Sequence, residues 1–322
     1  MTTKSHDDAA TGLPFDEAVR LYLMECKFRN FSSESIRKYR YSLKNFQECL
    51  ESHQLEWSSL TQRDLTHTIL PDLLQQLSVR TVNCILCILK DFFKFHVEEQ
   101  RIPDSIAADT KLFKIEQQLI HTFSDEQLQA LLSQPDRSTF TGYRNYIMML
   151  VLLDTGMRLK ELAGLRIKDV DFTEQIIRIQ MGKGRKSRTV PIQRICMRQL
   201  QLYLMERGSE AHDFLWTNLD NRPFEAAGIR AMMARYCKKA KIEGIQCSCH
   251  TFRHTMAKKY LLNGGDIFTL QRILGHAKIE TTRYYVELFS RDLQEQHEKY
   301  SPVENMLEEF PDLIDAEEGN PK

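Results

Sequence analysis

Residues 155–162 read Thr155-Gly156-Met157-Arg158-Leu159-Lys160-Glu161-Leu162. The apolar run from Tyr146 to Leu153 just before this stretch predicts a buried helix, which Gly156 ends. Arg158 therefore lies directly after a helix break and near the amino terminus of the next helix, where a phosphate group is favoured. The stretch predicts a helical domain with a cationic side chain at the junction of two helices.

The residues on both sides of this junction extend the helical pattern and add a β-hairpin. Ser124 caps a predicted helix, and Gln127 stands in the capping-box position. The runs 176–179 and 188–191 predict two strands, joined by a turn that contains Gly182-Lys183-Gly184. Helices are predicted again from about residue 226 to 293. The expected fold class is mainly α, with a small β-sheet or hairpin in this domain.

The first hundred residues predict a separate, all-helical domain. Apolar residues recur at helical spacing after Phe15, Ser32 or Ser33 caps a second helix, and another runs from about Ser78 to Val97. A chain of 322 residues, 42% of them hydrophobic, suits two domains with a core each. The predicted parts are a disordered amino terminus (1–12), a helical domain (13–108), a linker (109–122), a second domain (123–301) and an acidic tail (302–322).

Six chemically active side chains follow one another along the chain. In order they are Arg158, Lys183, His250, Arg253, His276 and Tyr285. Single fragments such as Gly-Lys-Gly or His-x-x-Arg occur by chance, but the whole set in this order, over about 130 residues, is specific. Taken together, the set resembles the tyrosine recombinases, also called the phage integrase family. That family has a two-domain, C-shaped clamp whose first domain binds the DNA core site.

The resemblance implies a reaction at a DNA phosphodiester. This group is anionic and has an alkoxide leaving group, so cleavage needs charge neutralisation, a proton donor and a nucleophile. Arg158 and Arg253 match the family's phosphate-binding arginines, whose planar fork bonds two oxygens and keeps its charge. The resemblance makes Lys183 the general acid that protonates the leaving 5′ oxygen, and Tyr285 the nucleophile.

The remaining members of the set have supporting roles by the same resemblance. His250 would assist proton transfer and phosphate contact, and His276 would bond the scissile phosphate. Glu161 would orient the catalytic side chains without contacting the substrate, rather than bind a metal. The basic side chains expected to contact DNA from the first domain are Arg37, Lys38, Arg40, Lys44 and Arg80.

Three alternative interpretations of these residues are less favoured. Tyr284 is adjacent to Tyr285, but the nucleophile of the family follows the Leu-Gly-His histidine by nine residues, which selects Tyr285. His250 and His254 invite a zinc site, yet Thr251 stands where the zincin motif needs glutamate. Arg185 precedes Lys186-Ser187 where a phosphate-binding loop needs glycine, so an ATP site is not expected. We therefore expect neither a metal nor another cofactor.

The formal net charge of zero hides an uneven distribution. Residues 286–322 hold eleven Asp or Glu and three Lys or Arg, a balance of −8, which leaves +8 on residues 1–285. A basic body with an acidic tail suits a polyanionic ligand. We found no apolar run long enough to span a membrane and no signal peptide, so a soluble, cytoplasmic protein with eight reduced cysteines is expected.

The expected function is site-specific DNA recombination through a 3′-phosphotyrosine, by a tetramer acting on two duplex sites. The simple two-domain architecture resembles Xer-type or transposon-encoded recombinases, and the segment after Tyr285 would dock on a neighbouring subunit. A type IB topoisomerase that relaxes DNA, or a non-catalytic DNA-binding regulator on the same fold, is the alternative. The target site and the biological role of the reaction stay open.

Overall fold

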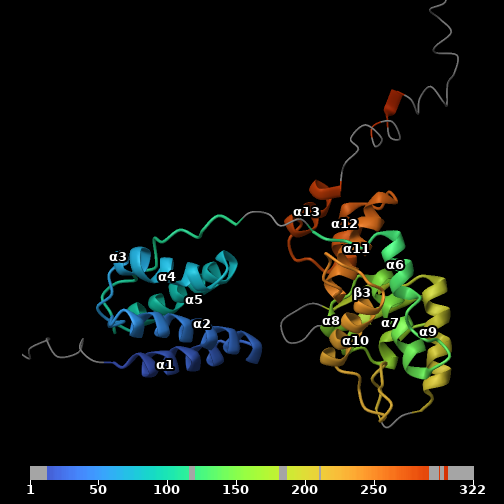
Figure 1. Cartoon of the computed structure of the whole chain (residues 1–322), viewed down its shortest axis with the longest axis horizontal. Coiled ribbons are helices and arrows are strands. Elements are labelled where there is room, and N and C mark those ends of the chain that lie inside the picture. The colour runs from blue at the N-terminus through green and yellow to red at the C-terminus, as the bar shows by residue number, and fades with distance from the viewer. Residues whose placement is uncertain are drawn as a thin grey trace, which may run out of the picture. The chain divides into compact units, whose positions relative to one another are not determined.

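The computed structural model describes residues 13–115, 120–180, 187–209, 212–289, 297 and 301–303. Its contacts divide the chain into two compact units, residues 1–118 and 119–322. Figure 1 shows the first unit in blue to teal and the second in green to red. Among the described residues, no helix combines the length and the apolar character needed to cross a membrane.

The described part of the first unit is helical. Its elements are α1 (Phe15–Phe28), α2 (Ser33–Ser52), α3 (Gln62–Asp64), a π-helical turn (Leu65–Ile69), α4 (Leu70–Gln76) and α5 (Val79–Glu98). The hydroxyls of Ser32 and Ser78 accept hydrogen bonds from the third residue beyond, which caps α2 and α5. Buried aromatic rings of α1, α2 and α5 form the core between these helices, among them Tyr22, Phe46, Phe92 and Phe93.

The second unit is mostly helical, with one small sheet among its described residues. Its helices are α6 (Asp125–Leu132), α7 (Phe140–Thr155), α8 (Leu159–Ala163), a 3-10 turn (Ile167–Asp169), α9 (Arg194–Arg207), α10 (Ala226–Lys239), α11 (Cys249–Leu262), α12 (Ile267–Leu274) and α13 (Glu280–Phe289). Helix α7 packs against both α9 and α11, and its buried side chains include Ile147, Met148, Val151 and Leu152. It is therefore the central helix of this unit.

The sheet is antiparallel, in the order β1 (Val170–Asp171), β2 (Ile176–Ile179) and β3 (Arg188–Pro191). Ile177 pairs with Val170 on one side and with Val190 on the other. Strand β3 also packs against α12. The mainly α fold with a small sheet is confirmed, and so are the strands predicted at 176–179 and 188–191. Strand β1, only two residues long, shows no alternation in the sequence and was not predicted.

The prediction of eight reduced cysteines is wrong for one pair. Cys237, in the last turn of α10, and Cys247, shortly before α11, form a disulfide. Their Cα atoms are 5.8 Å apart, inside the range that a disulfide spans. The chain reverses between α10 and α11 and brings the two residues together, which their separation of ten residues did not reveal. The other six cysteines are free.

Candidate active site

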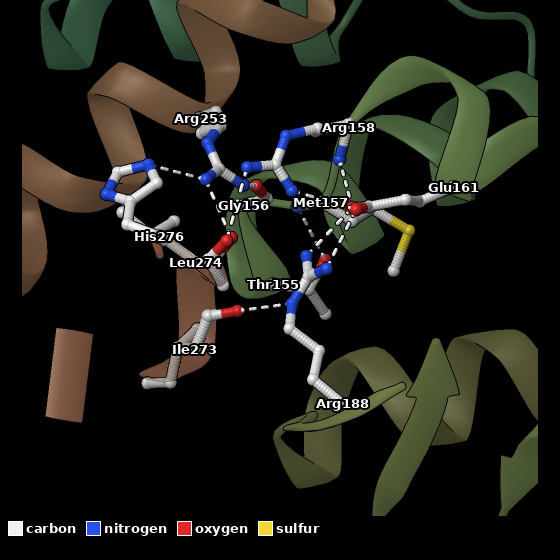
Figure 2. Close-up of polar contacts among 11 residues, drawn as sticks. Thr155, Gly156, Met157, Arg158, Glu161, Arg188, Arg253, Ile273, Leu274 and His276 are labelled. Atoms are coloured by element: carbon white, nitrogen blue, oxygen red, sulfur yellow. Dashed lines mark hydrogen bonds and ion pairs between the residues drawn. The ribbon is translucent and has the colours of Figure 1, made fainter. Parts of the chain in front are cut away.

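The junction predicted from residues 155–162 is present. Helix α7 ends at Gly156, which has the left-handed backbone conformation (φ +60°), and Arg158 immediately precedes α8. The backbone N–H of Arg158 donates to Glu161 Oε2 at 2.7 Å, and its Nη1 donates to Glu161 Oε1 at 2.9 Å. Glu161 therefore caps α8 and holds the half-buried Arg158 side chain at the same time (Figure 2).

Arg253 lies on α11 with only 1% of its surface exposed. Its Nη1 donates to the carbonyl of Gly156 at 2.7 Å, and its Nη2 donates to the carbonyl of Leu274 at 2.7 Å. Both carbonyls belong to helix C-termini, where the helix dipole concentrates negative partial charge. Burial and the neighbouring Arg158 lower the pKa of this guanidinium to about 10, so it remains charged near neutral pH.

Two glycines allow these carbonyls to approach Arg253. Gly275 follows α12 as Gly156 follows α7, and its φ is +66°. A Cβ on Gly156 would lie 2.8 Å from Leu274 Cδ2, and one on Gly275 would lie 2.7 Å from Arg188 Cδ. The Thr-Gly-x-Arg and Leu-Gly-His stretches are thus two helix ends that face each other across Arg253, as Figure 2 shows.

His276 contacts Arg253 and also lies beside the tyrosine. Its Nε2 is 2.7 Å from Arg253 Nη2, and its Nδ1 is 2.8 Å from Thr282 Oγ1. Because arginine can only donate, Nε2 accepts and Nδ1–H donates to the threonine. Burial and the charge of Arg253 lower the pKa of His276 to about 4, so the ring is neutral at neutral pH. The ring stacks on that of Tyr285, with centroids 6.3 Å apart.

Tyr285 lies on α13 and is 3% exposed. Its hydroxyl is 2.7 Å from His254 Nδ1 and lies within the electrostatic influence of Arg253. Burial raises the pKa of this hydroxyl, and the charges on Arg253 and Arg158 oppose that effect. The phenol is therefore protonated at neutral pH. The neighbouring tyrosine considered as the alternative, Tyr284, has a side chain outside the described residues.

Sequence reasoning missed Arg188, the first residue of β3. It makes a two-pronged ion pair with Glu161, at 2.7 and 2.8 Å, and both side chains are only 9% exposed. Its Nε donates to the carbonyl of Ile273 on α12 at 2.9 Å. Burial opposes the ionisation of Glu161, but the hydrogen bonds from Arg188 and Arg158 hold its pKa at about 2. An arginine at the start of a predicted strand gives no signal of such a contact in the sequence.

The other predicted residues lie apart from this cluster or outside the described chain. His250 is exposed in the first turn of α11, and its ring centroid is 4.4 Å from that of His254. Partial burial, together with the charges of Arg253 and Arg158, lowers its pKa. Lys183 lies outside the described residues. The predicted DNA contacts are exposed on the first unit, on α2 (Arg37, Lys38, Arg40 and Lys44) and at the start of α5 (Arg80).

The cluster is strongly cationic. Figure 2 brings together three guanidinium groups, those of Arg158, Arg188 and Arg253, and one carboxylate, that of Glu161. Among the described residues, no group of three His, Cys, Asp or Glu side chains is placed to hold a metal ion. A buried cationic cluster with a tyrosine hydroxyl at its edge is suited to an anionic substrate that the hydroxyl can attack.

Comparison with known proteins gives matches to both units. Residues 121–291 match the model of the phage integrase family, and residues 21–100 match that of the phage integrase N-terminal SAM-like domain. The tyrosine recombinase XerC of Chlamydia muridarum (strain MoPn / Nigg) is 31% identical over 255 residues, which make up 78% of this chain and 80% of XerC.

Two solved structures are similar along most of the chain. The crystal structure of XerA recombinase has a TM-score of 0.51 and 27% identity, covering 89% of this chain and 99% of XerA. XerH recombinase, solved in a post-cleavage complex with a palindromic difH substrate, has a TM-score of 0.69 and 23% identity, covering 91% of this chain and 86% of XerH. At this lower identity the second likeness concerns the fold alone.

Proposed function

The chain belongs to the phage integrase family, whose relatives include tyrosine recombinases, and from this premise we propose that it cleaves and rejoins duplex DNA at a specific site through Tyr285. The intermediate would be a 3′-phosphotyrosine, and two duplex sites would exchange strands within a tetramer. The observation that carries the proposal is the convergence of the Tyr285 hydroxyl, Arg253 and His276 from three helical segments around one buried position.

The charges of this cluster fit the needs of the reaction. The attack adds electron density to the non-bridging phosphate oxygens, and Arg158 and Arg253 would neutralise it. Arg188 takes up the charge of Glu161, so Arg158 shares this carboxylate and keeps donors for a phosphate. His276 accepts from Arg253 through Nε2, so it would bond a phosphate oxygen once that nitrogen carries a proton.

The scheme accounts for the proton given to the leaving oxygen and for the energy needed to rejoin the strands. Lys183 would protonate the leaving 5′ oxygen, and His250 would assist from the edge of the site. The 3′-phosphotyrosine keeps the bond energy of the phosphodiester, so rejoining to another 5′ hydroxyl requires neither ATP nor a metal ion. We therefore expect the activity to persist in a chelator.

The remaining parts of the chain would bind DNA and assemble the complex. We propose that residues 13–108 contact one face of the duplex through the basic side chains of α2 and Arg80, and that residues 123–301 carry the catalysis. The segment at about 286–301 would dock on a neighbouring protomer, with residues 302–322 as an acidic tail; most of this segment lies outside the described residues. A cytoplasmic protein that acts on a chromosome or a mobile element would fit this scheme.

The experiment that tests this function is capture of the covalent intermediate. Wild-type protein is incubated with fragmented genomic DNA of its source organism, stopped with detergent, and the DNA attached to protein is sequenced. We expect one recurrent site, adducts that persist in EDTA, and none with Tyr285→Phe. If Tyr284→Phe is the inactive variant instead, the assignment of the nucleophile is wrong.

The two alternative functions give different results. Plasmids with one or two copies of the site separate them, because a recombinase yields recombinants only from two sites. Relaxation of a supercoiled plasmid without recombinants would indicate a type IB topoisomerase. A non-catalytic regulator would give no adduct to sequence, but it would retain one recurrent sequence when the same DNA fragments are selected by non-covalent binding.

A further inference from the structure

His254 contacts the proposed nucleophile, although the scheme above gives it no role. It follows Arg253 directly on α11, and its Nδ1 is 2.7 Å from the Tyr285 hydroxyl on α13. The two rings are 5.5 Å apart between centroids. The sequence suggested only a metal site for this histidine, as the second member of a His-x-x-x-His pair. Its contact with a hydroxyl that must lose a proton suggests a different role.

The donors and acceptors around the hydroxyl give the direction of this hydrogen bond. Burial raises the pKa of the same hydroxyl, but the positive charge of Arg253 acts in the opposite direction and makes the phenolic O–H a better hydrogen-bond donor. A neutral histidine has one ring nitrogen with a free lone pair. Burial, with His250 and Arg253 nearby, lowers the pKa of His254 to about 4, which keeps the ring neutral at neutral pH. In this arrangement the phenol donates to Nδ1 while Arg253 polarises the oxygen.

We propose that His254 accepts the phenolic proton of Tyr285 during DNA cleavage and returns it during rejoining; this inference rests on the proposed function. In cleavage, the Tyr285 oxygen bonds to phosphorus, the phenolic O–H proton moves to His254 Nδ1, and the bond between phosphorus and the 5′ oxygen breaks. The departing 5′ oxygen takes its proton from the general acid. In rejoining, the 5′ oxygen bonds to phosphorus and its hydroxyl proton returns to the general acid, while the bond between phosphorus and the tyrosine oxygen breaks and that oxygen takes the proton from His254.

A weak base is suited to this transfer. Before the attack, the phenol holds its proton far more tightly than His254 would, because burial raises the pKa of the tyrosine and lowers that of the histidine to about 4. As the oxygen becomes part of a phosphate ester, it can no longer retain the proton, and even a weak base then removes it. The tyrosine thus stays protonated until a phosphate is present.

The charged and titratable groups that face His254 do not compete for this role. His250 lies one turn earlier on the same helix, Arg253 is its neighbour in the chain, and Tyr285 faces it from α13. Arg253 has no lone pair to offer, and His276 uses Nε2 to accept from Arg253 and Nδ1 to bond Thr282. His250 has its ring against His254 and is more exposed, so it is available to the 5′ side of the reaction.

The first test needs no DNA. Protein with ¹⁵N-labelled histidines is studied by long-range ¹H–¹⁵N correlation, and the His254 signals are assigned by their loss in His254→Asn. We expect Nδ1 of His254 to be unprotonated and Nε2 protonated at neutral pH, with a shift of the Nδ1 signal in Tyr285→Phe. A protonated Nδ1 in the wild-type protein would overturn the proposal, because that nitrogen could not accept the phenolic proton.

The second test measures the single-turnover rate of adduct formation on a nicked duplex that carries the site captured with the wild-type protein. Asparagine at position 254 can still accept a hydrogen bond but cannot take a proton. We expect His254→Asn to slow adduct formation by at least about 100-fold, the range of general acid–base catalysis, with little change in DNA affinity. The ratio of wild-type to variant rates should fall from about pH 6 to about pH 9, as hydroxide replaces the lost base.

The controls separate this inference from the proposed function. His53→Asn, in the first unit, should react like the wild type, and His254→Gln provides a second variant if His254→Asn is poorly folded. A wild-type protein that forms no adduct contradicts the proposed function. An active wild type with equally active His254→Asn overturns the role of His254 alone. A slow variant whose rate ratio is constant with pH would also overturn proton transfer, since it indicates positioning only.

Discussion

Arg188 joins three parts of the second unit through one side chain. It pairs with Glu161 on α8, donates to the carbonyl of Ile273 on α12, and is the first residue of β3. Breaking a buried ion pair from one side leaves an uncompensated charge, at a cost of about 3–5 kcal/mol. We expect Arg188→Ala to lower the free energy of unfolding, measured in urea, by about that amount.

The neighbouring strand offers a matched control for this variant. Arg178 of β2 pairs with Asp171 at 2.6 Å, but its side chain is 52% exposed. Exposed pairs contribute about 0–1 kcal/mol, so Arg178→Ala should change stability little. Equal losses in the two variants would contradict the importance given to the buried pair.

Glu161 should make stability depend on pH in the acid range. Hydrogen bonds from Arg188 and Arg158 outweigh burial and hold its pKa at about 2, below its ordinary 4.5. A carboxyl group whose pKa is lower in the folded protein than in the unfolded chain stabilises the fold at pH values above the unfolded pKa. This contribution is lost as the pH falls from about 4.5 through about 2. Denaturant unfolding of the wild type and Glu161→Gln should differ by about 3 kcal/mol near neutral pH, and the gap should close over that interval. A gap that stays constant down to about pH 2 would show that Glu161 is not the titrating group.

The sequence indicated the proposed reacting groups more readily than the groups that contact them. Arg158, Arg253, His276 and Tyr285 were selected for their chemistry and lie together in the structure. Arg188 and His254 were not selected, because their roles arise from contacts between segments far apart in the chain. His254 did have a signal in its position beside Arg253, but spacing suggested a metal site and gave no indication of the tyrosine.

At the scale of elements, Gly156 shows how a helix end determines the geometry of the site. An L side chain in its left-handed conformation costs about 1–2 kcal/mol, and a Cβ would also press on Leu274. Because the Gly156 carbonyl accepts from Arg253, we expect Gly156→Ala both to lower the melting temperature and to slow adduct formation.

Gly244 separates these two effects. Its φ is +73°, but a Cβ there would meet nothing within 4 Å, and it lies in the loop before α11. Gly244→Ala should lose stability without the same loss of cleavage. If Gly156→Ala cleaves DNA at the wild-type rate, the position of that carbonyl does not control Arg253.

Elements with strong local signals were predicted well. The capping serines of α2 and α6 form the expected hydrogen bonds, and the strands β2 and β3 have the expected bounds. Helix α9 was not predicted, and three of its apolar residues, Ile195, Leu202 and Met205, are exposed. Its pattern is therefore blurred, since periodicity reports a helix best when one face is apolar and the other polar.

At the scale of the whole molecule, the family and the mainly α fold are confirmed, whereas the domain limits remain predictions. Sequence patterns can separate two helical domains, but they do not report how the domains are arranged around a ligand. The net charge of zero also conceals an uneven distribution, with +8 on residues 1–285 and −8 on the remainder.

Salt dependence tests DNA binding by the whole molecule. Each phosphate contact releases counterions, so the logarithm of the binding constant should fall by about 0.9 per contact for each log unit of salt. We expect a steep slope for the wild type on the captured site, and a slope smaller by about one contact for Arg37→Ala. Lys94→Ala, an exposed lysine of α5 paired with Glu98, serves as the control and should leave the slope unchanged. A flat response of the wild type would contradict binding by both domains.

The two peptide carbonyls around Arg253 have a further consequence. A carboxylate in their place would have satisfied the same donors, but it would also have cancelled the charge of the guanidinium. The carbonyls of Gly156 and Leu274 carry only partial negative charge, so they hold the side chain in a dry interior while the guanidinium keeps its formal charge. Among the residues that the structure describes, no carboxylate forms an ion pair with Arg253, which is less exposed than the other buried arginines. In the proposed reaction, a phosphate of the DNA backbone takes that place, and the electrostatic neutrality of the site is reached only when substrate and protein are counted together.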